Sequence, residues 1–66
     1  MVVQLRTYWR RKKTGVIYKV TDMNYRGDVR LTPVYMPPGV RARETWKYYV
    51  HVPIDLEQVE RPEGTA

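Results

Sequence analysis

The chemistry that the residue types of this chain suit best is the binding of an anion. Its densest charged segment is Arg10, Arg11, Lys12 and Lys13, four consecutive cations in a chain of 66 residues. At a hairpin tip, each cation could contact a phosphate and release counterions, which gives affinity that depends on salt rather than on base sequence. A solvated turn that protects a strand edge from aggregation would use the same residues.

Cations and aromatic rings also alternate with other residues along the chain. Arg6, Tyr8 and Arg10 take every second position, and Trp9 lies in the opposite phase. Because successive side chains of a strand point to opposite faces, one face would be basic and aromatic while the other joins a core. Tyrosine rings can stack on bases while Arg and Lys pair with phosphates. By the same alternation we expect the exposed face to hold Arg6, Tyr8, Lys19, Arg30, Lys47 and Tyr49, and the core to hold Trp9 and Trp46.

A third candidate is the segment of residues 35–43, in which an apolar tip with Pro37 and Pro38 precedes Arg41 and Arg43. An apolar wedge flanked by cations could enter a minor groove. A short polyproline segment could instead dock on a protein. The prolines could also simply stiffen a connection.

Catalysis and metal binding have little support in the residues. His51 is the single histidine, cysteine is absent, and no carboxylate lies near His51 in a recognisable triad pattern. We therefore expect no enzyme activity, metal or cofactor, and an exposed strand position for His51. A site built on the symmetry axis of an oligomer remains an alternative, because it would leave no local motif.

The charge of the chain is unevenly distributed. Residues 1–54 hold eleven Lys and Arg against three acidic residues, a net charge of +8, whereas residues 55–66 have a net charge of −3. A basic body attracts anionic partners by long-range steering. Without cysteine, and without an apolar run long enough for a signal peptide or a membrane span, we expect a soluble cytoplasmic protein.

Strand formers in short runs, separated by turn residues at intervals of about ten, predict an all-β fold of five strands. We expect strands at residues 3–11, 16–23, 29–36 and 46–52, a 3₁₀ turn at 53–56 and a last strand at 57–60. Gly15 supplies a positive φ in the first turn, and Pro33 predicts an edge or a bulge. The residues expected to point inward are Val16, Tyr18, Val20, Val29, Leu31, Trp46, Tyr48, Val50, Val52 and Val59.

This layout resembles the SH3-like small barrels, a superfold that includes Tudor and KOW modules. The resemblance covers roughly residues 5–61 and rests on strand order and on the segments 15–20 and 53–59. It implies a single small barrel over residues 1–61, with 62–66 as a flexible tail; an OB-like barrel is the second choice. Small barrels of this kind are frequently encoded by phages and mobile elements.

Two classes of function follow. The first hypothesis is a non-enzymatic module that binds DNA or RNA, mainly through phosphates. The alternative is a protein-interaction module that docks on a larger protein through residues 36–39 and exposed tyrosines, or that self-associates. For the first hypothesis the binding residues would be Arg6, Tyr8, Arg10, Arg11, Lys12, Lys13, Lys19, Arg30, Arg41, Arg43, Lys47 and Tyr49.

Overall fold

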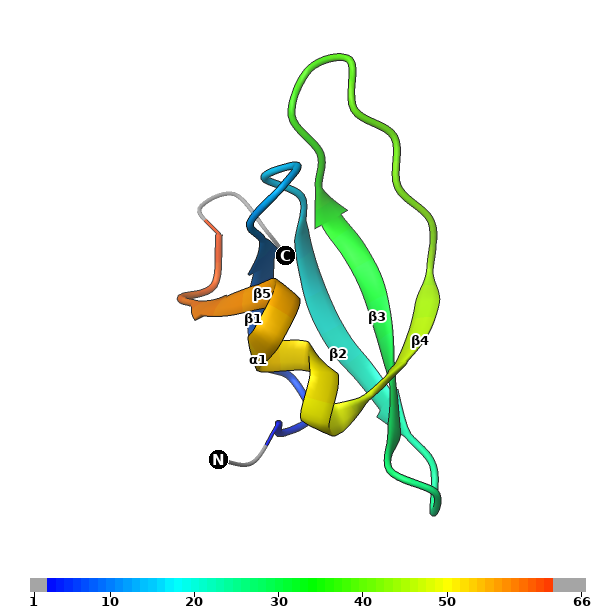
Figure 1. The fold of residues 1–66 in the computed structure, drawn as a ribbon. Helices are drawn as coiled ribbons and strands as arrows, with labels where there is room; N and C mark the ends of the chain where they lie inside the picture. Colours follow the sequence, from blue (N-terminus) through cyan, green and yellow to red (C-terminus); the bar gives the residue numbers. More distant parts are fainter. Residues whose placement is uncertain (1–2, 63–66) are drawn as a thin grey trace.

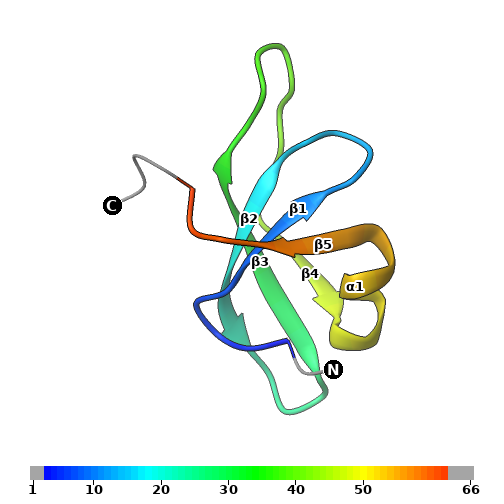
Figure 2. The ribbon, with the colours of Figure 1, turned by 90° about the vertical axis from the view of Figure 1, so that its left-hand side faces the viewer.

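Five antiparallel strands and one helical segment form the part of the chain that the computed structural model describes, residues 3–62. The sheet has the order β4-β3-β2-β1-β5 and curls into a half-barrel (Figures 1 and 2). This architecture confirms the prediction of an all-β fold with a helical turn before the last strand. In chain order the elements are β1 (Tyr8–Arg11), β2 (Ile17–Met23), β3 (Asp28–Tyr35), β4 (Thr45–Tyr48), the 3₁₀ helix η1 (Tyr49–His51), α1 (Val52–Asp55) and β5 (Leu56–Val59).

The curl of the sheet is associated with two irregularities between β2 and β3. The register shifts between Val20 and Asp22. It shifts again between Ile17, which pairs with Tyr35, and Tyr18, which pairs with Pro33. A shift of this kind leaves an extra residue on one strand, bends it and increases its twist. The bulge predicted near Pro33 is therefore confirmed.

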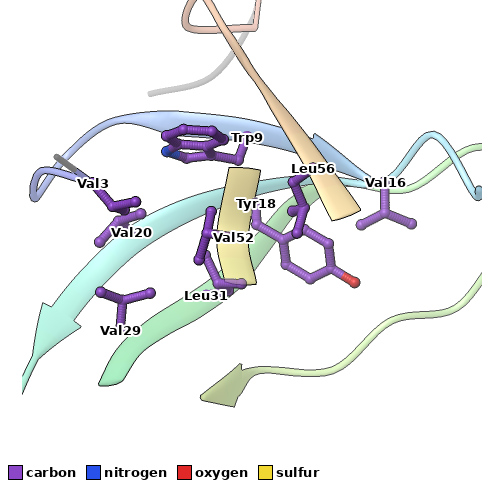
Figure 3. Packing of buried hydrophobic residues seen from close by; sticks show 9 residues of the cluster. All are labelled: Val3, Trp9, Val16, Tyr18, Val20, Val29, Leu31, Val52 and Leu56. Carbon is purple, nitrogen blue, oxygen red and sulfur yellow. The ribbon is translucent and has the colours of Figure 1, made fainter. Parts of the chain in front are cut away.

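The core lies on the inner face of the curled sheet. Val16, Tyr18 and Val20 of the β2 segment are buried on this face, as predicted, together with Val29 and Leu31 of β3. Figure 3 shows that they pack with Trp9 and with two residues from beyond β4, Val52 and Leu56. The indole N–H of Trp9 donates to Thr7 Oγ1 at 2.9 Å, so the buried ring leaves no donor unpaired.

The first strand begins at Tyr8 and not at residue 3, because the chain turns at residues 4–7. Arg6 has φ +65°, a left-handed conformation that interrupts a strand. The Thr7 hydroxyl donates to the Gln4 carbonyl at 2.6 Å, and the Arg6 N–H donates to the Val20 carbonyl at 2.9 Å. Arg6 therefore belongs to a turn beside β2 and not to the strand of Tyr8 and Arg10.

The fourth strand is shorter than predicted, and its inward residues were assigned wrongly. β4 pairs with β3 only as far as Tyr48, which lies opposite Asp28, the first residue of β3, so the chain has no strand partner beyond that point. The helical segment therefore starts at Tyr49 and not at residue 53. Of the four residues expected to point inward from this segment, only Val52 is buried; Trp46, Tyr48 and Val50 are exposed.

The last strand also differs in phase from the prediction. Val59 lies opposite Tyr8 and Leu56 lies opposite Arg11 in the β1–β5 pairing. Leu56 is buried, whereas Val59 is half-buried on the outer face. The inward apolar residue of this segment is Leu56, because β5 begins immediately after α1.

Within residues 3–62, none of the helices is long and apolar enough to cross a membrane. Of the predicted flexible tail at residues 62–66, positions 63–66 lie outside the described residues.

Candidate functional site

The sheet surface opposite the core, called here the outer face, carries several of the predicted binding residues. In the β1–β2 pairing Tyr8 lies opposite Lys19, and in the β3–β4 pairing Arg30 lies opposite Trp46. These residues alternate with the buried Trp9, Val20, Val29 and Leu31 and therefore point away from the core. The structure thus brings Tyr8, Lys19 and Arg30 to one side of the sheet.

Tyr8 lies on this face but offers little of its ring to a ligand. Only 8% of its surface is exposed, and the Lys19 ammonium lies 5.8 Å from the ring centroid. A cation at this distance over an aromatic face is held by the ring quadrupole. Tyr8 therefore positions Lys19 and does not provide a free surface for stacking on a base.

Arg30 is held on the outer face by hydroxyl groups. Its Nε donates to Thr21 Oγ1 at 2.9 Å, and Thr21 Oγ1 lies 2.8 Å from Thr32 Oγ1. Arg30 Nε also lies 3.8 Å from Glu44 Oε2. The guanidinium is consequently oriented by neighbours, and its charge is partly balanced by one carboxylate.

Three predicted binding residues have other surroundings. Arg10 forms an exposed ion pair with Glu57 of β5. Lys47 lies opposite the buried Val29 and donates to Asp55 Oδ2 at 2.9 Å, so it lies on the inner side of β4 and not on the outer face. Tyr49 lies in η1 with its ring centroid 5.1 Å from that of Tyr48, because β4 has already ended.

The cationic hairpin tip forms where the sequence predicted it, between β1 and β2. Gly15 has φ +79°, and its N–H donates to the Arg11 carbonyl at 2.8 Å. Lys12 and Lys13 are exposed, whereas Arg11 is half-buried next to β5.

One carboxylate lies near the hairpin tip. The hydrogen bond and charge of Lys47, followed by the charges of Arg11 and Lys13, lower the pKa of Asp55 from its ordinary value of 3.8. The Lys12 N–H also donates to the Asp55 carbonyl, at 3.2 Å. The cations of the tip are therefore close enough to α1 to stabilise the ionised form of Asp55.

The β3–β4 loop touches this hairpin tip. A Cβ built on Gly15 would lie 3.2 Å from Pro37 Cγ, so the two loops are in direct contact at this point. Val40 and Ala42 pack against the core, and the residues that follow each of them, Arg41 and Arg43, are exposed. The loop thus uses its small apolar residues as anchors and turns its arginines to solvent.

We call the exposed cations of these two touching loops the basic end. Within residues 3–62, none of its members forms an ion pair. The turn residues around Gly15 could predict the hairpin tip, but they could not predict that the long loop would touch it. The basic end consists of Lys12, Lys13, Arg41 and Arg43.

Trp46 is the residue of potential function that the sequence reasoning missed. It is 47% exposed on the outer face, in β4, opposite Arg30. No signal in the sequence places it there, because alternation with the polar Thr45 and Lys47 favours an inward Trp46. An exposed indole can stack on a base or bury against a protein.

The only histidine of the described chain was expected at an exposed strand position. His51 is exposed in η1, and its ring meets the Tyr48 ring edge-on at 5.9 Å. Across residues 3–62 there is no group of three or more His, Asp or Glu placed to hold a metal ion.

Comparison with known proteins adds no family to this description. No protein-family model matches the chain, and no curated protein or solved structure has significant similarity to it.

Proposed function

We propose that this protein is a non-enzymatic module that binds nucleic acid, chiefly through phosphate groups. The observation that carries the proposal is the basic end, in which Lys12 and Lys13 of one loop and Arg41 and Arg43 of another are exposed at two loops in contact. Exposed cations that form no ion pair within the described residues attract a polyanion and release its counterions when they bind phosphates. Phosphate contacts fix position without reading sequence, so we expect weak sequence preference.

The outer face carries further candidate contacts for a nucleic acid. Lys19 and Arg30 are fixed there by Tyr8 and by Thr21 respectively, and Trp46 adds an exposed ring. The strand order and the helical segment before β5 are compatible with an SH3-like small barrel. We propose that the half-barrel belongs to that superfold, and fold alone does not decide its ligand.

The proposal is tested by fluorescence anisotropy with labelled random duplex and single-stranded oligonucleotides. If the four cations of the basic end each contact a phosphate, raising salt from about 50 to 200 mM weakens binding to single strands about 50-fold, and binding to duplex more. Absence of binding at low salt would refute the proposal.

Charge reversal locates the interface. The double variant Lys12→Glu, Lys13→Glu is expected to abolish measurable binding at 100 mM salt. Lys13→Glu and Arg26→Glu form a matched pair with the same change of net charge, but Arg26 lies in the β2–β3 turn at the far end of the molecule (Figure 1). Binding should fall much more for Lys13→Glu; equal losses would show that only the net charge matters.

A second candidate function is a protein-docking module, an accessory factor of the kind that phages and mobile elements encode. It is favoured by Tyr35 and Met36, which are 48% and 45% exposed beside Pro37. β4 and β5 also each pair on one side only, which leaves edges for self-association. Charge reversal at Lys12 and Lys13 would leave such docking largely intact, and sedimentation at several concentrations would detect self-association.

A further inference from the structure

A hollow on the outer face lies away from the basic end. It has a volume of about 540 Å³, within the usual range for small-ligand pockets, and is bounded by the turn before β1, by Lys19 of β2 and by residues 58–61. Tyr8 lies between these boundaries and lines it. The hollow is open to solvent, so a ligand there needs charged or hydrogen-bonding partners.

The side chains around the hollow are suited to an anion. Among the described residues, three cations and one carboxylate line it, namely Arg6, Lys19, Arg61 and Glu60. Arg6 and Lys19 also line a smaller adjoining hollow of about 230 Å³, so both side chains are shared by the two hollows. Neither of them forms an ion pair with another residue of the described range 3–62.

The backbone of Arg6 provides a second, independent observation. Arg6 is the only described non-glycine residue with a positive φ, +65°. This left-handed conformation is costly for a side chain with a Cβ, and a glycine would adopt it without that cost. Strained backbone conformations cluster at active sites and ligand clamps, which makes the Arg6 side chain a candidate ligand.

We propose that this hollow binds a phosphate group, with the Arg6 guanidinium and the Lys19 ammonium as its ligands. Arg6 supplies a planar fork of donors that matches phosphate oxygens, and Lys19 supplies a point charge that Tyr8 holds in place. The site is separate from the basic end. It shares Lys19 with the outer face, and a bound phosphate in the hollow goes beyond the proposed function. The same phosphate chemistry could come from a free nucleotide or from the backbone of a nucleic acid.

The test uses Arg6→Gly, which removes the guanidinium but allows the left-handed turn. Isothermal titration with inorganic phosphate and with adenosine monophosphate is expected to show saturable binding to the unmodified protein, weakened about tenfold or more by Arg6→Gly. Adenosine, which lacks the phosphate, should not bind. The thermal midpoint of Arg6→Gly should not fall, so that lost binding cannot be attributed to unfolding.

Arg26→Ala is the matched control, because it removes one exposed arginine from a distant turn; it should leave phosphate binding unchanged. Equal binding by Arg6→Gly and Arg26→Ala, or no saturable binding of phosphate and adenosine monophosphate, would overturn the proposal. If Arg6→Gly weakens the binding of adenosine monophosphate but not that of oligonucleotides, the site binds a free nucleotide. If it weakens the binding of both ligands, the site binds phosphates of a nucleic-acid strand. Lys12→Glu, Lys13→Glu should impair only oligonucleotide binding, so that failure of the basic end is distinguished from failure of this site.

Discussion

Asp55 shows how one exposed ion pair connects the helical segment to the sheet. Its carboxylate accepts a hydrogen bond from Lys47 of β4 at 2.9 Å, and both residues belong to segments that flank η1. The bond and the charge of Lys47 lower the pKa of Asp55 below 3.8, and Arg11 and Lys13 add smaller contributions. A carboxyl whose pKa is lower in the folded state stabilises the fold in its ionised form.

The pH dependence of Asp55→Asn follows from that direction. The stabilisation is complete above the pKa of the unfolded chain, near 3.8, and is lost as pH falls through the lower pKa of the folded state. We expect the variant to unfold more easily than the unmodified protein at pH 7 and the difference to shrink below about pH 4. Urea unfolding at several pH values measures it, and a difference that grows on acidification would contradict the mechanism.

The two tryptophans show what alternation can predict and where it stops. Trp9 was placed in the core correctly, because β1 pairs on both sides and its phase could be counted within the strand itself. Trp46 was placed in the core wrongly, because it was assigned to one continuous strand and one face with Val50 and Val52. Those two residues lie in η1 and α1, where alternation no longer applies. An inward or outward assignment by alternation is therefore only as reliable as the predicted end of the strand.

At the scale of elements, the β2–β3 turn fixes where β4 ends. The Asn24 side-chain oxygen accepts the N–H groups of Arg26 at 3.0 Å and Asp28 at 2.9 Å. The Gly27 carbonyl accepts the Tyr49 N–H at 2.9 Å, which connects this turn to the start of η1. Gly27 has φ +91°, and a Cβ there would lie 3.0 Å from ring atoms of Tyr48 and Tyr49.

Gly27→Ala and Gly39→Ala separate backbone strain from steric contact. Both glycines have positive φ, but nothing lies within 4 Å of a Cβ built on Gly39. We expect Gly39→Ala to cost about 1 kcal/mol of unfolding free energy, from the left-handed backbone alone. Gly27→Ala should cost more, because the Tyr48 and Tyr49 rings must also move. Urea unfolding followed by circular dichroism measures both free energies. Equal losses for the two variants would show that the Tyr48 and Tyr49 rings move at no measurable cost.

The turns illustrate how far local sequence predicts the elements. The turns around Gly15 and at residues 24–28 were predicted from their own residues, because turn chemistry is local. The start of η1 was not, because it depends on where β3 begins and on a hydrogen bond to Gly27 from a residue 22 positions away. The same limit applies to the candidate site: the hairpin tip was predictable, whereas the Gly15–Pro37 contact and the hollow beside Arg6 arise from tertiary packing.

At the scale of the whole molecule, stability and binding should respond to salt in opposite directions. The chain has a net charge of +5. Residues 3–62 form three ion pairs, and all three are at least partly exposed. Exposed pairs contribute about 0–1 kcal/mol each, whereas an excess of like charge opposes the compact state. Salt screens both the attraction within the ion pairs and the repulsion between like charges, with a Debye length of about 10 Å at 0.1 M.

We therefore expect the urea midpoint to stay constant or rise between about 50 and 200 mM salt, while the affinity for single-stranded oligonucleotides falls about 50-fold. The two measurements on the same samples separate screening of the interface from unfolding of the protein. Lys12→Glu, Lys13→Glu sharpens the comparison: it lowers the net charge by four, so its midpoint should depend less on salt. A midpoint that falls steeply with salt would mean that the three ion pairs outweigh the repulsion, and the loss of affinity would then include unfolding.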